Sequence, residues 1–370
     1  MACGQVEVWH SPDPEDLGWD RFLESTSLGQ FQQSSAWGQY KQTEGWYVCR
    51  IVLTMEDHII GGFQILWKTT RMGRIGYVSK GPVLAEDDPE LATFIVKLVQ
   101  SQASRLRLRA LIVQAPDFGD LIARFLPQAG FLGMLPGKII NASCMLDLTQ
   151  TSGNLEAGFS SSTRRDSRLA AKAGVIVREG TAAEISIFHE LMAATCARQG
   201  VSPNPPSAEA TAALWNSMSQ GGHARLTFAV YRDEIISGNL SILYGNRASF
   251  FKVGWNGRHP KSYPNNMLYF EALNWARANQ YSTADWVGIS RETALAILGG
   301  DKLSESKTSG VDMFKLRFGG QPVLLPSAVV WINNPILRQC YKMALPLLVA
   351  AKSAAKSWRP GKAGKSNPST

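Results

Sequence analysis

Residues 56–62, EDHIIGG, and residues 232–238, RDEIISG, are two copies of one seven-residue pattern, with Asp, both Ile and the last Gly at matching positions. Each copy lies between stretches rich in β-branched and aromatic residues: 46–54 and 63–69 around the first, 224–231 and 239–245 around the second. An acid-bearing, Gly-flanked turn between two such stretches is typical of a β-hairpin. The sequence therefore predicts the same hairpin twice.

The order of elements after each hairpin also recurs. A strand (74–84), a helix (88–106) and a strand (109–116) are expected after the first, and a strand (247–256), a helix (265–280) and a strand (283–289) after the second. A repeat of this length indicates tandem α/β domains rather than a solenoid. The Ser/Gly/Thr-rich residues 149–163 are the expected linker. We expect a first domain over residues 1–150, a second over 151–335, and a C-terminal helix with a basic disordered tail over 336–370.

The composition suits a globular protein with two cores, because 45% of the 370 residues are hydrophobic and 18% are charged. No run of about 18 apolar residues predicts a membrane-spanning helix, and the N-terminus lacks the pattern of a signal peptide, so a cytoplasmic protein is expected. The five cysteines form no CxxC pair and the five histidines no metal-binding spacing. Neither a disulfide framework nor a metal site is expected.

Residues 161–180, SSTRRDSRLAAKAGVIVREG, predict a basic helix that Ser162 or Thr163 caps and that Gly174 ends. Its cations recur every four residues on one face: Arg164, Arg168 and Lys172, with Arg165 beside them. Such a row is often only a solvated helix face. Because like charges repel and the guanidinium suits phosphate, contact with a phosphate or a nucleic acid is an equal alternative.

Five stretches in a fixed order resemble the FemAB family of aminoacyltransferases, which add amino acids to the peptide stem of peptidoglycan precursors: 31–46, 73–84, 162–180, 264–289 and 310–323. Members consist of two GNAT-type acyltransferase domains, in agreement with the internal repeat. The resemblance thus implies an α/β fold of two tandem GNAT-like domains, each a mixed sheet flanked by helices.

The resemblance also implies a reaction and its partners. An aminoacyl group would pass from aminoacyl-tRNA to an amine of a nucleotide- or lipid-linked muropeptide, without a cofactor. In relatives a lysine of the first domain and an arginine near the domain junction hold the precursor's phosphates. Lys41 occupies the matching lysine position, and Arg164 or Arg168 is proposed for the arginine, with Arg165, Lys80 and Trp37 as further substrate-binding candidates. The chain lacks the coiled-coil arm of some relatives, and this leaves the tRNA donor open.

Transfer of an acyl group to an amine needs a neutral amine, an oriented ester and donors for the developing oxyanion. The sequence shows no nucleophile elbow, so catalysis by positioning is expected. Lys252, Tyr263 and Asn265 lie between a strand and the start of the next helix, where N–H groups face anions, and Asp285 ends the following strand. These four are the catalytic candidates. Helix capping by the asparagine and a strand-end turn at Asp285 are the structural alternatives.

Two other functions remain open. The first is a CoA-dependent N-acyltransferase in exopolysaccharide or cell-envelope biosynthesis, although the R/Q-x-x-G-x-G/A loop of such enzymes is missing. The second is a non-catalytic module that binds a phosphorylated glycan or a nucleic acid. Residues 334–358 predict a further helix that combines an apolar face with cations. Packing against a partner is the favoured role of this helix, and peripheral contact with a membrane surface is the alternative.

Overall fold

The computed structural model describes residues 5–134, 139–301 and 309–357, and only the backbone of residues 351–357. The strands of the first sheet are β1 (Glu7–Ser11), β2 (Tyr47–Met55), β3 (His58–Thr70), β4 (Gly73–Ser79), β5 (Val83–Leu84), β6 (Ala110–Gln114), β7 (Leu132–Gly133) and β15 (Val329–Ile332). Those of the second are β8 (Ala142–Asp147), β9 (Ile176–Glu179), β10 (Ala224–Tyr231), β11 (Glu234–Tyr244), β12 (Arg247–Trp255), β13 (Thr283–Asp285) and β14 (Gln321–Leu324).

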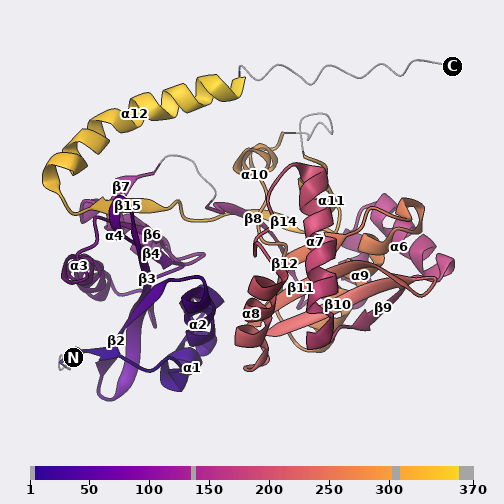
Figure 1. Cartoon of the computed structure of the whole chain (residues 1–370), viewed down its shortest axis with the longest axis horizontal. Helices are drawn as coiled ribbons and strands as arrows, with labels where there is room; N and C mark the ends of the chain where they lie inside the picture. The colour runs from indigo at the N-terminus through magenta and orange to yellow at the C-terminus, as the bar shows by residue number, and fades with distance from the viewer. Residues whose placement is uncertain (1–4, 135–138, 302–308, 358–370) are drawn as a thin grey trace.

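Helices accompany both sheets (Figure 1). Those of the first domain are α1 (Leu17–Ser25), η1 (Phe31–Gln33), α2 (Ser35–Thr43), α3 (Pro89–Arg105) and α4 (Asp120–Gln128). Those of the second are α5 (Ser152–Gly158), α6 (Ser161–Ala173), η2 (Ala182–Glu184), α7 (Ile185–Gln199), α8 (Ala208–Ser219), η3 (Pro260–Ser262), α9 (Pro264–Ala278), α10 (Arg291–Leu298) and α11 (Gly310–Leu316). The last helix is α12 (Pro335–Ser357). The expected α/β fold of two mixed sheets flanked by helices is confirmed.

The two copies of the repeated seven-residue pattern form hairpins with the same turn. Glu56 and Asp57 join β2 to β3, with φ of 49° and 61°. Arg232 and Asp233 join β10 to β11, with φ of 51° and 61°. Two consecutive residues at positive φ are the mark of a type I′ turn, which matches the twist of the strands that it joins. The turn that the sequence predicts is therefore present twice.

The hairpins also share a β-bulge. Ile60 has no register partner between the paired residues Ile59 and Gly61, and Ile236 has none between Ile235 and Ser237. A bulge of this kind adds one residue to a strand and increases its twist. The repeat thus preserves both the turn and the irregularity that follows it.

The two sheets exchange strands, and this differs from the expected division of the chain. The strand β8 precedes residue 150 but pairs with β13 and β14 of the second sheet. The strand β15 falls within the expected second domain, 151–335, but lies between β6 and β7 of the first sheet. The expected linker at 149–163 contains helix α5 and most of the first turn of α6. Long-range strand pairing, which leaves no local signal, therefore sets where the chain crosses between the domains.

An apolar core joins the domains. Phe31 and Trp37 of the first domain meet Phe251 of β12, with ring centroids 5.6 and 6.1 Å from it. Helix α2 also packs against α8 of the second domain. Aromatic pairs at this spacing stabilise an interface beyond the area that they bury. Residues of both domains are therefore held in fixed positions along their junction.

The parallel strands β12 and β13 separate soon after they begin. They pair only from Arg247 to Ser249 and from Thr283 to Asp285, although β12 continues to Trp255. No other described strand pairs with residues 250–255 of β12 on that side. The second sheet is therefore open between these two strands, and Asp285 lies where the opening starts.

Helix α12 stands away from both domains along much of its length (Figure 1). Its first turns contact β15 and the end of β7: Arg338 Nε donates to Ile332 O at 2.8 Å, and Tyr341 Oη donates to Gly133 O at 3.2 Å. None of the helices that the structure describes is long and apolar enough to cross a membrane. The expected basic tail after residue 357 lies outside the described residues.

Candidate functional site

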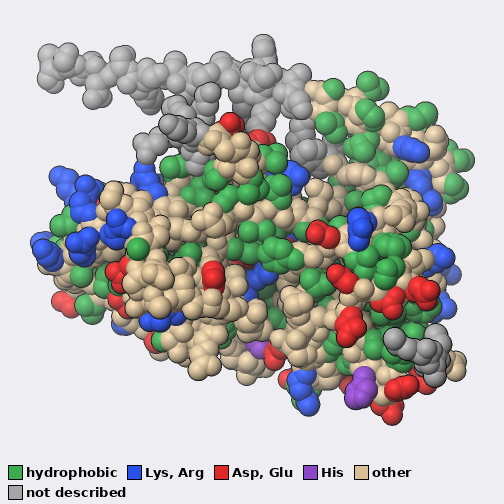
Figure 2. Space-filling model, turned by 180° about the vertical axis from the view of Figure 1, so that it is seen from behind, with side chains coloured by type: hydrophobic (Ala, Val, Ile, Leu, Met, Phe, Trp, Pro, Cys, Tyr) green, Lys and Arg blue, Asp and Glu red, His purple; other side chains and the backbone are tan. Residues whose placement is uncertain are grey.

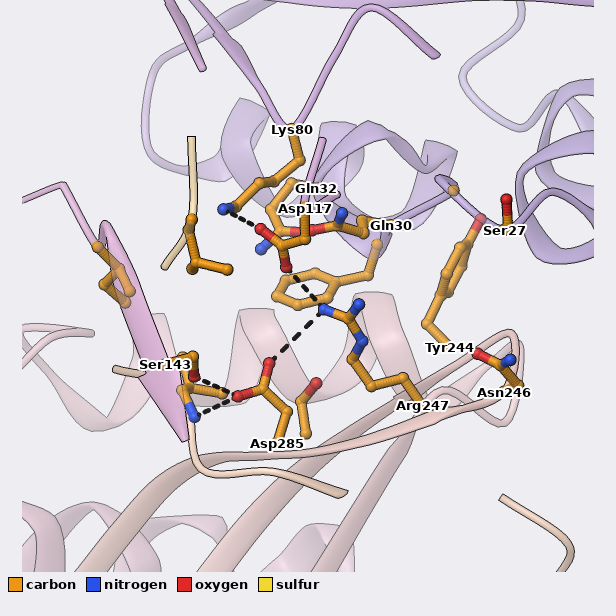
Figure 3. A pocket seen from close by; sticks show the side chains of 16 residues that line it. Ser27, Gln30, Gln32, Lys80, Asp117, Ser143, Tyr244, Asn246, Arg247 and Asp285 are labelled. Atoms are coloured by element: carbon orange, nitrogen blue, oxygen red, sulfur yellow. Dashed lines mark hydrogen bonds and ion pairs between the residues drawn. The ribbon is translucent and has the colours of Figure 1, made fainter. Parts of the chain in front are cut away.

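A cleft lies at the domain junction, where the strand ends of both sheets meet (Figure 3). Lys80 directly follows β4, and Asp117 comes three residues after the neighbouring parallel strand β6. Arg247 begins β12 and Asp285 ends β13. The cavity volume is about 60 Å³, so the cleft admits only a small group in this conformation. Both domains therefore contribute ionisable side chains to one confined space.

These four side chains form a chain of alternating charge. Lys80 Nζ lies 2.5 Å from Asp117 Oδ1, and Arg247 Nη1 lies 2.7 Å from Asp117 Oδ2. The same Arg247 nitrogen is 3.6 Å from Asp285 Oδ2. Buried charges need partners of this kind, because desolvation without pairing is costly. Arg247 thus links a carboxylate of the first domain to one of the second.

Asp285 is the second-domain end of this chain, and its buried side chain lies on that wall of the cleft. Ser143 Oγ donates to Asp285 Oδ1 at 2.5 Å, and the backbone N–H of Val287 donates to the same oxygen at 2.8 Å. Burial nevertheless raises the pKa of Asp285 above its ordinary value, against the opposing effects of Arg247 and these two donors. A carboxylate with a raised pKa is a better proton acceptor. Asp285 is therefore suited to take a proton from a group that enters the cleft.

The first-domain wall of the cleft is fixed by glutamines. The Gln30 amide donates to Asp117 Oδ2 at 3.0 Å and accepts from Asp117 N at 2.7 Å. Gln33 Nε2 donates to Ser79 O at 2.6 Å, directly before Lys80. Lys80 has φ of 56°, which is unfavourable for a residue with a side chain. The surrounding hydrogen bonds hold it in this conformation and direct its ammonium group at Asp117.

The structure brings Lys41 and Lys252 to the same part of the domain interface. Lys41 Nζ lies 2.6 Å from Glu44 Oε2 and 4.8 Å from the ring centroid of Trp37. Lys252 Nζ lies 4.6 Å from the ring centroid of Phe251, in the aromatic core that contains Trp37. Burial lowers the pKa of Lys252, and the positive charge of Lys41 lowers it further, while Cys196 and Glu44 oppose the shift. Lys252 thus releases its proton more readily than an exposed lysine does.

Trp37 is packed more tightly than a ligand platform would be. Only 9% of its surface is exposed, and Phe31 and Phe251 pack edge-on against its ring at 5.1 and 6.1 Å. Its position therefore supports a packing role at the junction, and direct contact with a substrate requires this core to open.

The start of α9 offers fewer free N–H groups than the sequence suggests. Pro264 has no N–H group, and the backbone N–H groups of Asn266 and Met267 both donate to Tyr263 O. Asn265 Oδ1 accepts a hydrogen bond from Ser237 Oγ at 2.5 Å. Neither Tyr263 nor Asn265 lines the cleft that contains Asp285. The structure therefore separates these two catalytic candidates from Asp285.

Arg164 and Arg168 line a groove between α6 and α9, with a volume of about 360 Å³. Its apolar floor is formed by Phe159, Met267 and Phe270. Arg164 Nη1 donates to three carbonyl oxygens at the end of α5, between 2.5 and 3.2 Å away. The Ser167 hydroxyl in the groove is buried and has no hydrogen-bond partner among the described residues. The groove thus contains both cationic and unsatisfied polar groups.

Arg165 lies apart from this pair. Its side chain is 65% exposed and donates to Asp166 at 2.9 Å. The cap of the helix lies two or three residues earlier than expected, because Ser160 Oγ accepts from Thr163 N, while Gly174 ends the helix at φ of 86° as predicted. Figure 2 shows Lys and Arg side chains gathered over this edge of the second domain. The groove lies on the α9 face of the sheet, far from α2 in Figure 1, so the arginines and Lys41 do not form one site.

The sequence did not identify Gln30, Asp117, Ser143, Arg247 or Lys315 as site residues. Asp117 had a usable signal, since it follows a strand parallel to the one that precedes Lys80, and the ends of such strands meet. Arg247 had none, because only the packing of the two domains brings it to Asp117. Lys315 donates to Gly288 O, and burial lowers the pKa of its ammonium group. It lies in the stretch 310–323 on which the family resemblance partly rests.

Family models match both domains. The FemAB family model matches residues 15–116, and a model described as an acetyltransferase (GNAT) domain matches residues 157–294. The expected resemblance to FemAB proteins is confirmed, and the chain is an acyltransferase with tandem GNAT-like domains. No curated protein matches the chain.

Solved structures share the whole fold. FemX superposes with a TM-score of 0.77 at 18% identity, over 91% of this chain and 100% of its own. The C-terminal domain of a putative lysylphosphatidylglycerol synthetase from Agrobacterium fabrum gives a TM-score of 0.51 at 13% identity, over 90% and 96%. L-PGS from Bacillus licheniformis gives 0.52 at 13% identity, over 91% and 98%. At these identities the likeness establishes the fold.

Proposed function

We propose that this FemAB-like acyltransferase moves an aminoacyl group from charged tRNA to an amine of a peptidoglycan-type precursor, either nucleotide- or lipid-linked, on the cytoplasmic side of the inner membrane. One observation supports the proposal most strongly. The domain that matches the FemAB model and the domain that matches the GNAT model together line one cleft with ionisable groups. The small cavity suits an amine and the carbon that bears it.

The acceptor amine has to lose a proton as it attacks. Its nitrogen bonds to the ester carbonyl carbon, the ester C–O bond breaks, and the departing tRNA oxygen takes up the proton that the amine has given to Asp285, so that the carboxylate is restored. Asp285, with its raised pKa, accepts the amine proton, and Arg247 keeps its carboxylate oriented. No covalent intermediate is needed, because the ester is already activated. Asp285 is the catalytic residue of this proposal.

The donor is assigned to the opposite face of the second sheet. Arg164 and Arg168 in the groove beside α9 supply forked cations for phosphate groups, and the half-buried ring of Phe270 below them suits a nucleotide base. We place the path of the aminoacyl ester from this groove to the amine at the point of the sheet where the pairing of β12 with β13 ends, next to Asp285.

A second candidate, a CoA-dependent N-acyltransferase of envelope or exopolysaccharide biosynthesis, is favoured by the match of the second domain to an acetyltransferase (GNAT) domain. The start of α9 argues against it, because a pyrophosphate needs free backbone N–H groups and most of those near Tyr263 are already bonded. We therefore rank the tRNA donor first.

A mass-shift assay separates the two candidates. Purified protein receives a nucleotide-linked muropeptide with either a pool of charged tRNAs or a panel of acyl-CoAs. We expect the mass of one amino acid to be added with charged tRNA, and to disappear after ribonuclease treatment. A shift with acyl-CoA alone contradicts the proposal and supports the second candidate.

A matched pair of variants tests the assignment of Asp285. Asp285→Asn should lower the rate at least a hundredfold, the usual loss for a missing general base. Asp233→Asn, in the exposed β10–β11 turn, keeps the same change of charge and should leave the rate unchanged. Equal rates for both variants would remove Asp285 from the mechanism.

A further inference from the structure

Helix α12 exposes a continuous apolar stripe. Ile336, Met343 and Leu347 are 73%, 63% and 75% exposed, and Cys340 between them is exposed too. Their spacing of three and four residues places them on one side of the helix. Figure 2 shows hydrophobic side chains on this part of the molecule. A soluble surface helix normally buries such a stripe against the core.

The opposite side of α12 is already occupied by the first domain. Arg338 and Tyr341 donate hydrogen bonds to backbone carbonyls of Ile332 and Gly133. The Arg338 guanidinium also lies 5.7 Å from the ring centroid of Trp331, and Leu345 approaches Gly133. The helix is thus attached by the face that carries these residues, and this attachment leaves the apolar stripe directed outward.

The charge of this segment is strongly one-sided. From residue 335 to the end of the sequence there are seven cations and no Asp or Glu: Arg338, Lys342, Lys352, Lys356, Arg359, Lys362 and Lys365. The formal net charge of the whole chain is +8. A second copy of this helix would bring like charges together without an acid to pair them. A phospholipid surface with negative headgroups complements both the charge and the stripe.

We infer that α12 is an in-plane membrane anchor, whose stripe of Ile336, Cys340, Met343 and Leu347 enters the boundary between headgroups and acyl chains of an anionic bilayer. A helix of this kind is held by buried apolar area together with attraction between its cations and anionic lipid. The inference goes beyond the proposed reaction and needs neither of its substrates. It adds a membrane-facing role to the packing role that the sequence favoured for this helix and that its attached face fulfils.

Vesicle co-sedimentation without any substrate tests the anchor. The full chain is mixed with vesicles of phosphatidylcholine alone or of phosphatidylcholine with phosphatidylglycerol. We expect binding to the anionic vesicles that weakens as salt is added. Met343→Glu combined with Leu347→Glu should lower the partition coefficient at least tenfold. Because both side chains are exposed, the fold should be retained, as circular dichroism would verify.

A control variant adds the same two charges elsewhere. Met72 and Leu298 are exposed apolar side chains outside α12, at 73% and 56%. Met72→Glu combined with Leu298→Glu should bind anionic vesicles within about twofold of the unchanged protein, since only the small effect of total charge remains. Lys342→Gln should weaken binding about fivefold, the effect of one cation near a charged surface.

Three results would overturn the inference. The first is no binding of the unchanged protein to anionic vesicles. The second is an equal loss of binding in the α12 variant and in the control variant. The third is a dimer in solution, without vesicles, that the Met343→Glu/Leu347→Glu pair converts to a monomer, because a second copy would then be what covers the stripe.

Discussion

The two domains contain the same hairpin, but they differ in how far the parallel strands that follow it pair with each other. In the first domain, β4 and β6 pair as parallel neighbours over five positions, from Ile75 to Ser79 and from Ala110 to Gln114. In the second, β12 and β13 pair over three positions and then separate. The first sheet is therefore closed at the place where the second is open.

This difference shows how a duplicated fold divides two tasks. The closed copy fixes Lys80 and Asp117 at its strand ends, and the open copy presents Asp285 where its strands begin to part. Arg247 joins the two. One copy thus serves as a support, and the other keeps the gap in its sheet through which an acyl group is proposed to pass.

The largest expected effect comes from breaking the contact between the copies. Arg247→Ala leaves Asp285 without its ion pair and Asp117 with Lys80 alone, so the free energy of unfolding should fall by about 3 kcal/mol. Urea denaturation followed by tryptophan fluorescence measures this loss. Arg258→Ala is the control, because its 65%-exposed side chain pairs with Glu234 inside the second domain and should cost less than about 1 kcal/mol. Equal midpoints for both variants would contradict a coupling role of Arg247.

The repeated glycines sharpen the comparison. A Cβ on Gly62 would lie 2.5 Å from the backbone oxygen of Ile51, whereas one on Gly238 would first meet the ring of Phe228 at 2.9 Å. A ring can turn away, but a backbone oxygen in a paired strand cannot. We expect Gly62→Ala to lower the free energy of unfolding by about 3 kcal/mol and Gly238→Ala by about 1 kcal/mol. Comparison of the urea midpoints measures this, and equal losses in the two variants would show that the two copies are packed alike.

The arginine groove belongs to the second copy. Arg168→Ala removes a cation from the groove and should weaken tRNA binding about tenfold, with a shallower dependence on salt. Arg165→Ala removes the same charge from the neighbouring position, where the side chain is already paired with Asp166, and should change affinity less than about twofold. Filter binding over a range of salt concentrations gives both values. Similar losses in the two variants would indicate attraction to the general charge of α6 and not to the groove.

The smallest effect concerns Lys252, which faces the first domain. Burial lowers the pKa of Lys252 in the folded chain. Between that pKa and about 10.5, the unfolded chain therefore binds more protons than the folded chain does. Within this pH window, Lys252 makes the free energy of unfolding rise with pH. Lys252→Met should remove this rise and increase stability near neutral pH. Denaturation midpoints of variant and unchanged protein, compared between about pH 7 and 10, isolate the contribution. Lys97→Met, on the exposed face of α3, should follow the unchanged protein, and a Lys252→Met profile that did the same would contradict the expectation.

Much of the fold could be predicted from the sequence because its signals are local. The turn residues at 56–57 and 232–233, the glycine that ends α6 and the helical periodicity of α9 depend on neighbouring residues alone. The placement of β8 and β15 could not, because the sequence of a short apolar strand does not show which of the two sheets it joins. The family resemblance likewise predicted the tandem fold, which is confirmed. It did not predict the strand pairings that connect the two sheets.

The site was harder to predict than the fold. Asp285 was found because it ends a strand, whereas Arg247 and Gln30 became visible only when the domains were packed together. Trp37 and Asn265 were chosen for their residue type and their place beside a helix, and the structure gives them packing and hydrogen-bonding partners of their own. Residue type and local position indicate chemistry, but they do not say which side chains will meet.

The strand β15 has a consequence for synthesis of the chain. It lies between β6 and β7, so the first sheet lacks the strand that joins these two until residue 332 has been made, after all strands of the second sheet. During translation the first domain must wait with the edges of β6 and β7 unpaired, and unpaired edges invite pairing with other chains. The N-terminal domain therefore cannot complete its folding before the second domain has been synthesised. A ribosome that stalls before β15 leaves a fragment that is prone to aggregate.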